Sequence, residues 1–288
     1  MISFIIVNYL NYKVTLDCID SILLNVKLPN EEYEIIIVDN CSPNNSVEII
    51  KDKYRNYKNI SIISNEENYG FGIANNIGVS NSKGSKLIFV NSDVIFKNFN
   101  FEDFGNILDS NNRIGMLSSK ILYKDGTIQS VGNEFPNISN LFKNYVLFSN
   151  AKSNKNKKFK DYSNKGMIEC GWCSGSFFIC RKDNYLNVGG FDEKIFLYGE
   201  DLELGIKFIK FGYQNFVNDF YSVFHLHGAS SKITKPNYIR IRNHKLNDLY
   251  VFKKHKLFKN YILIRAMLEF NSIVIYVRSI FNYFFKGA

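Results

Sequence analysis

The chain has 288 residues, of which 45% are hydrophobic and 22% charged, proportions that are ordinary for a folded protein able to bury a full core. Its net charge of +9 is uneven, because Lys and Arg strongly outnumber the two acids, Asp248 and Glu269, after Lys232. Such a basic end suits either nucleic acid or an anionic membrane surface. Because no groove-binding motif accompanies it, the membrane surface is favoured.

The cysteines predict reduced thiols. Their number is odd, at five. Cys170 and Cys173 form a CxxC pair, but no second pair or nearby His pair completes a zinc site, so we expect both thiols to pack in a strand. The chain enters a strand at its start without a basic region or cleavage site, which predicts no signal peptide. Both features predict a cytoplasmic protein, held by its basic end at the inner face of the cell membrane.

Strands and helices alternate in the first part of the chain. Apolar runs predict strands over 3–7, 33–38 and 60–64, and a fourth that ends at Asp93. Helical spacing and cap residues predict helices over 15–24, 47–54 and 73–81. This alternation predicts an α/β protein with a doubly wound, mostly parallel sheet.

The second part of the chain is less regular. We expect a helix over 101–110, strand-like structure over 114–123 and a polar surface loop over 150–165. Alternating residues over 169–180 predict a return of strand structure, followed by a helix over 202–211 and a last strand over 220–224.

The final segment, 261–285, is apolar and aromatic but is interrupted by Arg265, Glu269 and Arg278, so it is not an uninterrupted membrane span. Two interpretations stay open: an amphipathic helix in the membrane interface, and a helix packed on the domain. We therefore divide the chain into a domain over 1–231 and a C-terminal helical segment over 232–288.

Polar side chains follow several predicted strands, at the edge where open α/β sheets bind ligands. Asp93 follows the apolar run 87–90, and it either closes a turn or binds a ligand. Asp39 either closes an Asx-turn or accepts hydrogen bonds from a base or ribose. His225 is either a core residue or a ligand. Asp93 and His225 together could hold Mn2+ or Mg2+ bridging a diphosphate.

Two further patterns precede helices. Glu200 and Asp201 stand side by side, and Asp201 is either a helix N-cap or a general base. Gly70 and Gly72 could let the backbone approach a diphosphate, but Asn75 stands where GxGxxG requires its third glycine.

Seven segments in order resemble the inverting family 2 glycosyltransferases of the GT-A fold, and among them the bacterial rhamnosyltransferase-like branch. The resemblance covers about 1–231. The segments are FIIVNY (4–9), IIIVDNCS (35–42), ENYGFGIANNIG (67–78), FVNSD (89–93), GWCSGSFFICRKD (171–183), GGFDEKIFLYGEDLELGIKFIKFGY (189–213) and HLHGASS (225–231).

The resemblance implies a nucleotide-sugar site and a metal site. The residues implied to bind the nucleotide sugar are Asn8, Asp39, Asn68, Gly70, Asn75, Asn91, Ser92 and Asp93. Asn91-Ser92-Asp93 matches the DxD position of the family, with Asn91 in place of the first Asp. Asp93 and His225 are the implied ligands of Mn2+ or Mg2+, with His227 a weaker substitute.

The resemblance also implies a catalytic pair and a pocket for the two sugars. Trp172 and Gly175 fall in the region that shapes the acceptor and donor-sugar pocket, and Asp201, preceded by Glu200, matches the catalytic base. The implied reaction is a single in-line displacement that inverts the anomeric carbon. The implied donor is a dTDP- or UDP-sugar, with rhamnose first and a hexose next, and the implied acceptor is a cell-surface glycan or lipid-linked acceptor.

Two alternatives remain at this stage. A nucleotidyltransferase shares the sheet, but it needs a glycine-rich triphosphate loop after the first strand, and 8–13 contains no glycine. A non-catalytic protein that binds sugar nucleotides is kept open by Asn91.

Overall fold

A computed structural model describes residues 1–130, 132–134, 166–226, 237–257, 262 and 265–266. The predicted loop over 150–165, nearly all of the segment over 261–285, and His227 lie outside the described residues.

The strands of the described chain are β1 (Ile2–Asn8), β2 (Tyr33–Asp39), β3 (Ile60–Ser64), β4 (Lys86–Asn91), β5 (Val94–Phe96), β6 (Ile114–Leu122), β7 (Ile128–Ser130), β8 (Met167–Cys170), β9 (Phe177–Arg181) and β10 (Gln214–His225). The helices are α1 (Tyr12–Asn25), α2 (Ser46–Tyr54), α3 (Phe71–Ser80), α4 (Phe101–Asp109), α6 (Lys182–Asn187), α7 (Glu200–Lys210) and α8 (Asn237–Lys254).

The strands form one mixed, mostly parallel sheet in the order β3-β2-β1-β4-β9-β6-β10-β5, with β7 beside β6 and β8 beside β10. Strands β1 to β4 pair in parallel, as do β6 and β10. Strand β9 is antiparallel to both of its neighbours, β4 and β6. The α/β class and the mostly parallel sheet expected from the sequence are confirmed.

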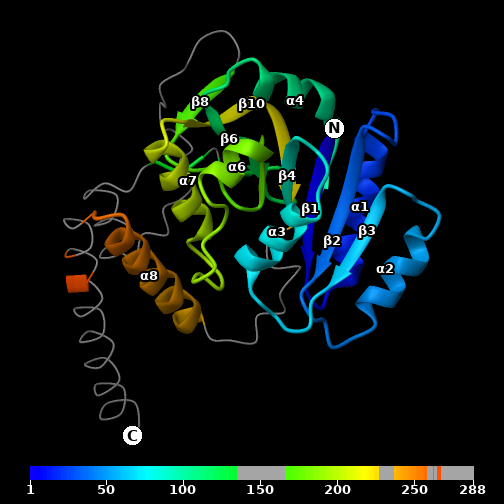
Figure 1. Cartoon of the computed structure of the whole chain (residues 1–288), viewed down its shortest axis with the longest axis horizontal. Helices are drawn as coiled ribbons and strands as arrows, with labels where there is room; N and C mark the ends of the chain where they lie inside the picture. The colour runs from blue at the N-terminus through cyan, green and yellow to red at the C-terminus, as the bar shows by residue number, and fades with distance from the viewer. Residues whose placement is uncertain (131, 135–165, 227–236, 258–261, 263–264, 267–288) are drawn as a thin grey trace, which may run out of the picture.

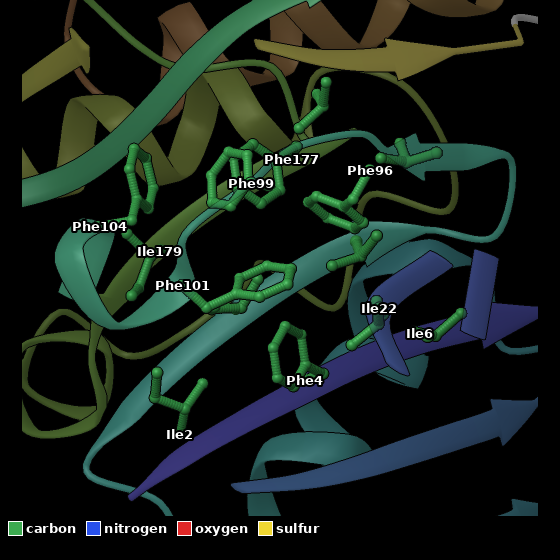
Figure 2. Close-up of a cluster of buried hydrophobic side chains, with 14 of the residues drawn as sticks. Ile2, Phe4, Ile6, Ile22, Phe96, Phe99, Phe101, Phe104, Phe177 and Ile179 are labelled. Atoms are coloured by element: carbon green, nitrogen blue, oxygen red, sulfur yellow. The ribbon is translucent and has the colours of Figure 1, made fainter. Parts of the chain in front are cut away.

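Helices cover both faces of this sheet (Figure 1). Successive side chains of β1 point to opposite faces and so contribute to two different cores. Ile2, Phe4 and Ile6 belong to a core that also includes buried residues of α1, α2 and α4. Figure 2 shows these three side chains among the phenylalanines of that core. Ile5 points into a second core, with buried residues of α3, α6 and α7. The sheet is therefore buried on both sides, which explains its continuous apolar runs.

Of the element boundaries that differ from those expected, three bear on the polar residues at the strand ends. Strand β4 ends at Asn91, so Ser92 and Asp93 form the turn to β5 instead of ending a strand. Helix α7 begins at Glu200, because Gly199, with φ of +92°, supplies the left-handed residue at its N-cap. The last strand, β10, is longer than predicted, since Gln214 to Asn218 also pair with β6 or β8.

Helix α8 lies outside α7, on the side away from α1 and α2 (Figure 1). Val251 and Phe252 of α8 pack in one apolar cluster with Leu202 and Ile206 of α7. None of the helices within the described part of the chain is sufficiently long and apolar to span a membrane.

Candidate functional site

The carboxyl ends of β1, β2 and β4 meet at one edge of the sheet. Asn8 is paired with Asp39, and Val7 with Asn91. Because β2 and β4 lie on opposite sides of β1, this edge is the point where the strand order reverses. Open α/β sheets bind ligands at such a switch point. The structure thus brings Asn8, Asp39 and Asn91 together, as the sequence predicted for strand ends.

Asp93 and His225 form a close pair at this edge. The Asp93 side chain is 1% exposed, and its Oδ1 lies 3.1 Å from Nε2 of His225. The other imidazole nitrogen, Nδ1, lies 3.0 Å from Oε1 of Gln129, and the amide nitrogen of Asn91 lies 3.4 Å from Nε2. His225 is therefore held between β7 and the turn after β4, and its role as a metal ligand remains a prediction. Gln129 was not anticipated from the sequence.

The Asp93–His225 pair fits a divalent cation. An imidazole that donates its Nδ1 proton to Gln129 turns the lone pair of Nε2 toward the Asp93 carboxylate, and two acceptors so close need a cation or a proton between them.

Within the described residues, no group of three or more His, Cys, Asp and Glu could hold a metal ion. A cation held by Asp93 and His225 would leave positions open to water and a diphosphate, which Mg2+ commonly binds.

Replacing Asn91 with aspartate is expected to tighten binding of Mn2+ by about tenfold, because a second carboxylate joins Asp93 and His225. Without metal, the same change places two carboxylates side by side, so the melting temperature should fall in chelator and recover with Mn2+. Calorimetric titration with Mn2+ and thermal melts check both parts. Unchanged Mn2+ affinity in this variant would argue that the cation does not lie beside residue 91.

Asp39 is 1% exposed and is held by its own turn and by β1. Its Oδ1 accepts from the backbone N–H of Ser42 at 2.8 Å, and its Oδ2 accepts from the Ser42 hydroxyl and from Asn8 Nδ2. Asn8 is fully buried, and its Oδ1 accepts from the Thr15 hydroxyl at 2.6 Å. Asp39 therefore closes the turn after β2, although its bond reaches the N–H three residues on and not the two of the expected Asx-turn, and Asn8 orients its carboxylate. Their contacts with a base or ribose remain predictions.

Asn40 organises the loop that enters α3, a role that the sequence did not single out. Its amide nitrogen donates to Asn68 Oδ1 at 2.7 Å and to the Gly70 carbonyl at 3.1 Å. Its oxygen accepts from Asn65 Nδ2 and from the backbone N–H of Tyr69. Asn68 is thus fixed at the same edge of the sheet as Asp39, since Asn40 follows Asp39 directly.

Gly70, at the N-cap of α3, is required by the local backbone conformation and packing. Gly70 has φ of +84°, and a Cβ there would lie 2.3 Å from the carbonyl oxygen of Phe196. The N–H of Phe71 donates to the same oxygen at 2.9 Å. Asn75 is 1% exposed and donates to the Phe71 carbonyl within the helix. These contacts explain both residues by packing, and their role beside a diphosphate remains a prediction.

Asp201 is held over the same edge by the segment between β8 and β9. Its Oδ2 accepts from the N–H of Gly175 at 3.1 Å, and its Oδ1 accepts from the N–H of Leu202 at 2.8 Å. The neighbour of Gly175, Ser176, accepts from the N–H of Asn91 at 2.9 Å. Asp201 is therefore linked to the Asn91–Asp93 turn through two consecutive backbone residues. It is not the N-cap of α7, which is Gly199.

Burial raises the pKa of Asp201 above its ordinary value, while the N–H groups of Gly175 and Leu202 oppose the rise. A carboxyl group with a raised pKa that still has two fixed hydrogen-bond donors suits a base that must accept a proton near neutral pH.

Glu200 is 7% exposed, and within the described residues its Oε2 has no hydrogen-bond partner. Burial and the adjacent Asp201 raise its pKa from 4.5 to about 8. The folded protein therefore keeps a proton on Glu200 that the unfolded chain loses between pH 4.5 and 8, so this residue makes stability fall as pH rises through that window.

Replacing Glu200 with glutamine should remove this loss of stability. The melting temperature of the variant should fall less than that of the wild type between pH 5 and pH 8.5, because glutamine stays neutral throughout. Thermal melts across this range test the prediction. Equal pH dependence in the two proteins would show that Glu200 ionises normally in the fold.

Trp172 and Gly175 lie on the segment between β8 and β9. Trp172 is half-buried and packs against the apolar cluster between α7 and α8. A Cβ on Gly205 of α7 would lie 2.3 Å from the Trp172 Cβ, so α7 approaches this segment closely. A Cβ on Gly175 would lie 3.5 Å from the Asp201 Cβ. Gly175 therefore contacts the candidate base directly, whereas the structure ties Trp172 mainly to the packing of α7.

Comparisons with known proteins agree with this geometry. Residues 3–186, more than half of the chain, match the family model described as Glycosyl transferase family 2. Rhamnosyltransferase WbbL of Escherichia coli K12 is 28% identical over 223 residues, which span 73% of this chain and 80% of that protein.

A second relative is the N-acetylglucosaminyl-diphospho-decaprenol L-rhamnosyltransferase of Mycobacterium tuberculosis. It is 34% identical over 85 residues, or 30% of this chain and 27% of that protein. Among solved structures, the mannosyltransferase PcManGT from Pyrobaculum calidifontis, in complex with GDP-Man and Mn2+, aligns with a TM-score of 0.61 and 14% identity. That alignment covers 93% of this chain and 69% of the other.

Proposed function

The chain belongs to glycosyl transferase family 2 and has a GT-A fold, and we propose that it transfers a sugar from a nucleoside-diphosphate donor to an acceptor hydroxyl with inversion. The observation that carries this proposal is the link from Asp201 through Gly175 and Ser176 to Asn91, beside the Asp93–His225 pair. The segment Gly175–Ser176 thus has the candidate base on one side and the candidate cation site on the other. This arrangement suits a reaction in which the acceptor oxygen attacks beside the base while the diphosphate oxygen leaves beside the cation.

The proposed reaction is a single displacement. Asp201 accepts the proton of the acceptor hydroxyl as that oxygen forms its bond to the anomeric carbon. The bond from the anomeric carbon to the phosphate oxygen breaks on the opposite face, and the nucleoside diphosphate leaves with that electron pair. Because no covalent bond to the protein forms, the anomeric configuration inverts.

Asp93 and His225 are the residues that would hold Mn2+ or Mg2+, and such an ion supplies positive charge to the leaving diphosphate. Asn91 and Gln129 fix the imidazole of His225 on either side. Asn40, Asn68 and Gly70 hold the loop after β3 beside the same edge, where we expect the nucleotide to lie.

For the donor, a dTDP- or UDP-sugar with rhamnose is our first proposal and a hexose the next. The two rhamnosyltransferases among the relatives support this choice. For the acceptor, we propose a growing cell-surface glycan on a lipid carrier. The name of the mycobacterial relative supports a lipid diphosphate acceptor.

A donor screen tests the proposal most directly. The full chain is incubated with dTDP-rhamnose, UDP-glucose, UDP-galactose and GDP-mannose, with and without Mn2+, and the released nucleoside diphosphate is measured. Mn2+-dependent release from one donor, raised by a lipid-linked glycan, is the expected result. Binding of a donor without release under any condition would instead support a non-catalytic protein that binds sugar nucleotides.

We also propose that the basic end of the chain binds the membrane surface at the cytoplasmic face. Lys and Arg dominate after Lys232, and the segment over 261–285 is rich in aromatic residues. Removing Tyr261 to Ala288 is expected to abolish sedimentation with vesicles that contain anionic lipid. The full chain with neutral vesicles serves as the control, and undiminished binding by the shortened protein would contradict the proposal.

A further inference from the structure

The candidate base follows a turn with unusual backbone geometry. Tyr198 has φ of +72° and Gly199 has φ of +92°, so two successive residues occupy the left-handed region just before α7. For tyrosine this conformation is strained and persists only where neighbouring groups hold it. Because Asp201 is in the first turn of α7, the direction of its carboxylate depends on how this turn is fixed.

Asn247 of α8 holds the turn. Its amide nitrogen donates to the carbonyl oxygen of Leu197 at 2.9 Å and to that of Tyr198 at 2.8 Å. A Cβ on Gly199 would lie 3.4 Å from the Asn247 Cβ, so the helix contacts the turn at every residue. His244, one helical turn earlier, stacks on the Tyr198 ring with centroids 5.9 Å apart.

Helix α8 is anchored to α7 by other residues. Lys254 lies 2.6 Å from Glu203 Oε1 and 2.7 Å from Asp192 Oδ2, and His255 Nε2 lies 3.1 Å from Glu203. Burial raises the pKa of Glu203, but the hydrogen bond from His255 and the charges of Lys207 and Lys254 outweigh it and lower the pKa below its ordinary value. The helix therefore stays docked by an ionised network about two turns beyond Asn247.

We propose that Asn247 is a positioning residue for the sugar-transfer reaction, fixing the Tyr198–Gly199 turn so that Asp201 points at the acceptor hydroxyl. This inference rests on the proposed function and deepens it, because it makes the C-terminal helix part of the catalytic apparatus. Only side-chain N–H donation satisfies both carbonyls at once, so the amide, and not merely the size of the residue, is required.

The test compares Asn247→Asp with Asn243→Asp. Aspartate has the shape of asparagine but no N–H to donate, and Asn243 is an exposed residue of the same helix, one turn before Asn247. Asn247→Asp should lower kcat for transfer at least tenfold and leave KM for the donor within twofold, since a small misplacement of a catalytic group is costly. Asn243→Asp should match the wild type in both constants.

Asn247→Ala removes the hydrogen-bond donor without adding a charge, and it should lower kcat to the same extent as Asn247→Asp. Amide exchange at 198–202 reports whether the turn is released in each variant. Wild-type kcat in a variant whose turn exchanges faster would overturn the inference, as would a loss confined to KM for the donor. Failure of the proposed function would look different, because the wild type and Asn243→Asp would then also show no transfer, and the role of Asn247 would fall with it.

Discussion

Replacing Asp201 with asparagine is expected to lower kcat for sugar transfer by about 10²- to 10⁴-fold, the range that general bases contribute. The amide has the shape of the carboxylate but cannot accept the proton of the acceptor hydroxyl. It can still accept one hydrogen bond from the N–H of Leu202 or Gly175, so α7 should keep its start. Donor affinity should change little, because Asp201 acts on the acceptor.

The measurement is kcat with saturating donor and acceptor, together with donor affinity by calorimetry without acceptor. Asp183→Asn is the matched control, since Asp183 is an exposed aspartate in the first turn of another helix, α6. It should leave both quantities within twofold of the wild type. Near wild-type turnover by Asp201→Asn would remove the base assignment and, with it, the mechanism proposed for this site.

The first half of the fold could be predicted from the sequence because its strands are buried on both faces. Such strands are continuous apolar runs, and the helices between them show regular apolar spacing. The position of β9 could not be predicted in this way. Phe177–Arg181 inserts antiparallel between β4 and β6. It pairs with residues about ninety positions away in β4 and about sixty in β6, and no local pattern specifies either partner.

The residues that carry charge at the site were easier to predict than those that hold them. Asp39, Asp93 and Asp201 follow strands or begin helices, and strand ends converge in this class of sheet. Asn40 and Asn247 were missed, because asparagine is frequent in this chain and only tertiary contacts mark these two.

Gly70 has a structural role that the sequence did not indicate. Its position before a helix suggested contact with a diphosphate, which stays a prediction, and the structure adds a close approach to a backbone oxygen of the protein itself, the Phe196 carbonyl.

Replacing Asp93 with asparagine is the second change expected to have a large effect, lowering kcat/KM at limiting Mn2+ by about 10²- to 10³-fold. A bound cation supplies several kcal/mol of charge stabilisation, and each 1.36 kcal/mol is tenfold in rate. Asparagine removes the negative charge that lies 3.1 Å from Nε2 of His225. It keeps the shape of the Asp93 side chain, which is only 1% exposed. Raising the Mn2+ concentration should recover part of the activity.

Activity is measured over a series of Mn2+ concentrations after treatment with chelator, and Mn2+ binding is measured separately by calorimetry. Asp52→Asn, which removes an exposed carboxylate on α2, is the control for net charge and should behave as the wild type. The wild type itself should lose activity in chelator and regain it with Mn2+. An Asp93→Asn protein with the metal dependence of the wild type would show that the cation, if one is used, is held elsewhere.

A double variant, Asn91→Asp with Asp93→Asn, separates the number of carboxylates from their position. It keeps one carboxylate in the turn but moves it two residues, to a side chain whose amide nitrogen lies 3.4 Å from Nε2 of His225. If charge alone retains the cation, this protein should recover most of the Mn2+ affinity lost in Asp93→Asn. We expect only partial recovery, because Asp93 Oδ1, at 3.1 Å, lies closer to Nε2 of His225 than the side chain of residue 91 does.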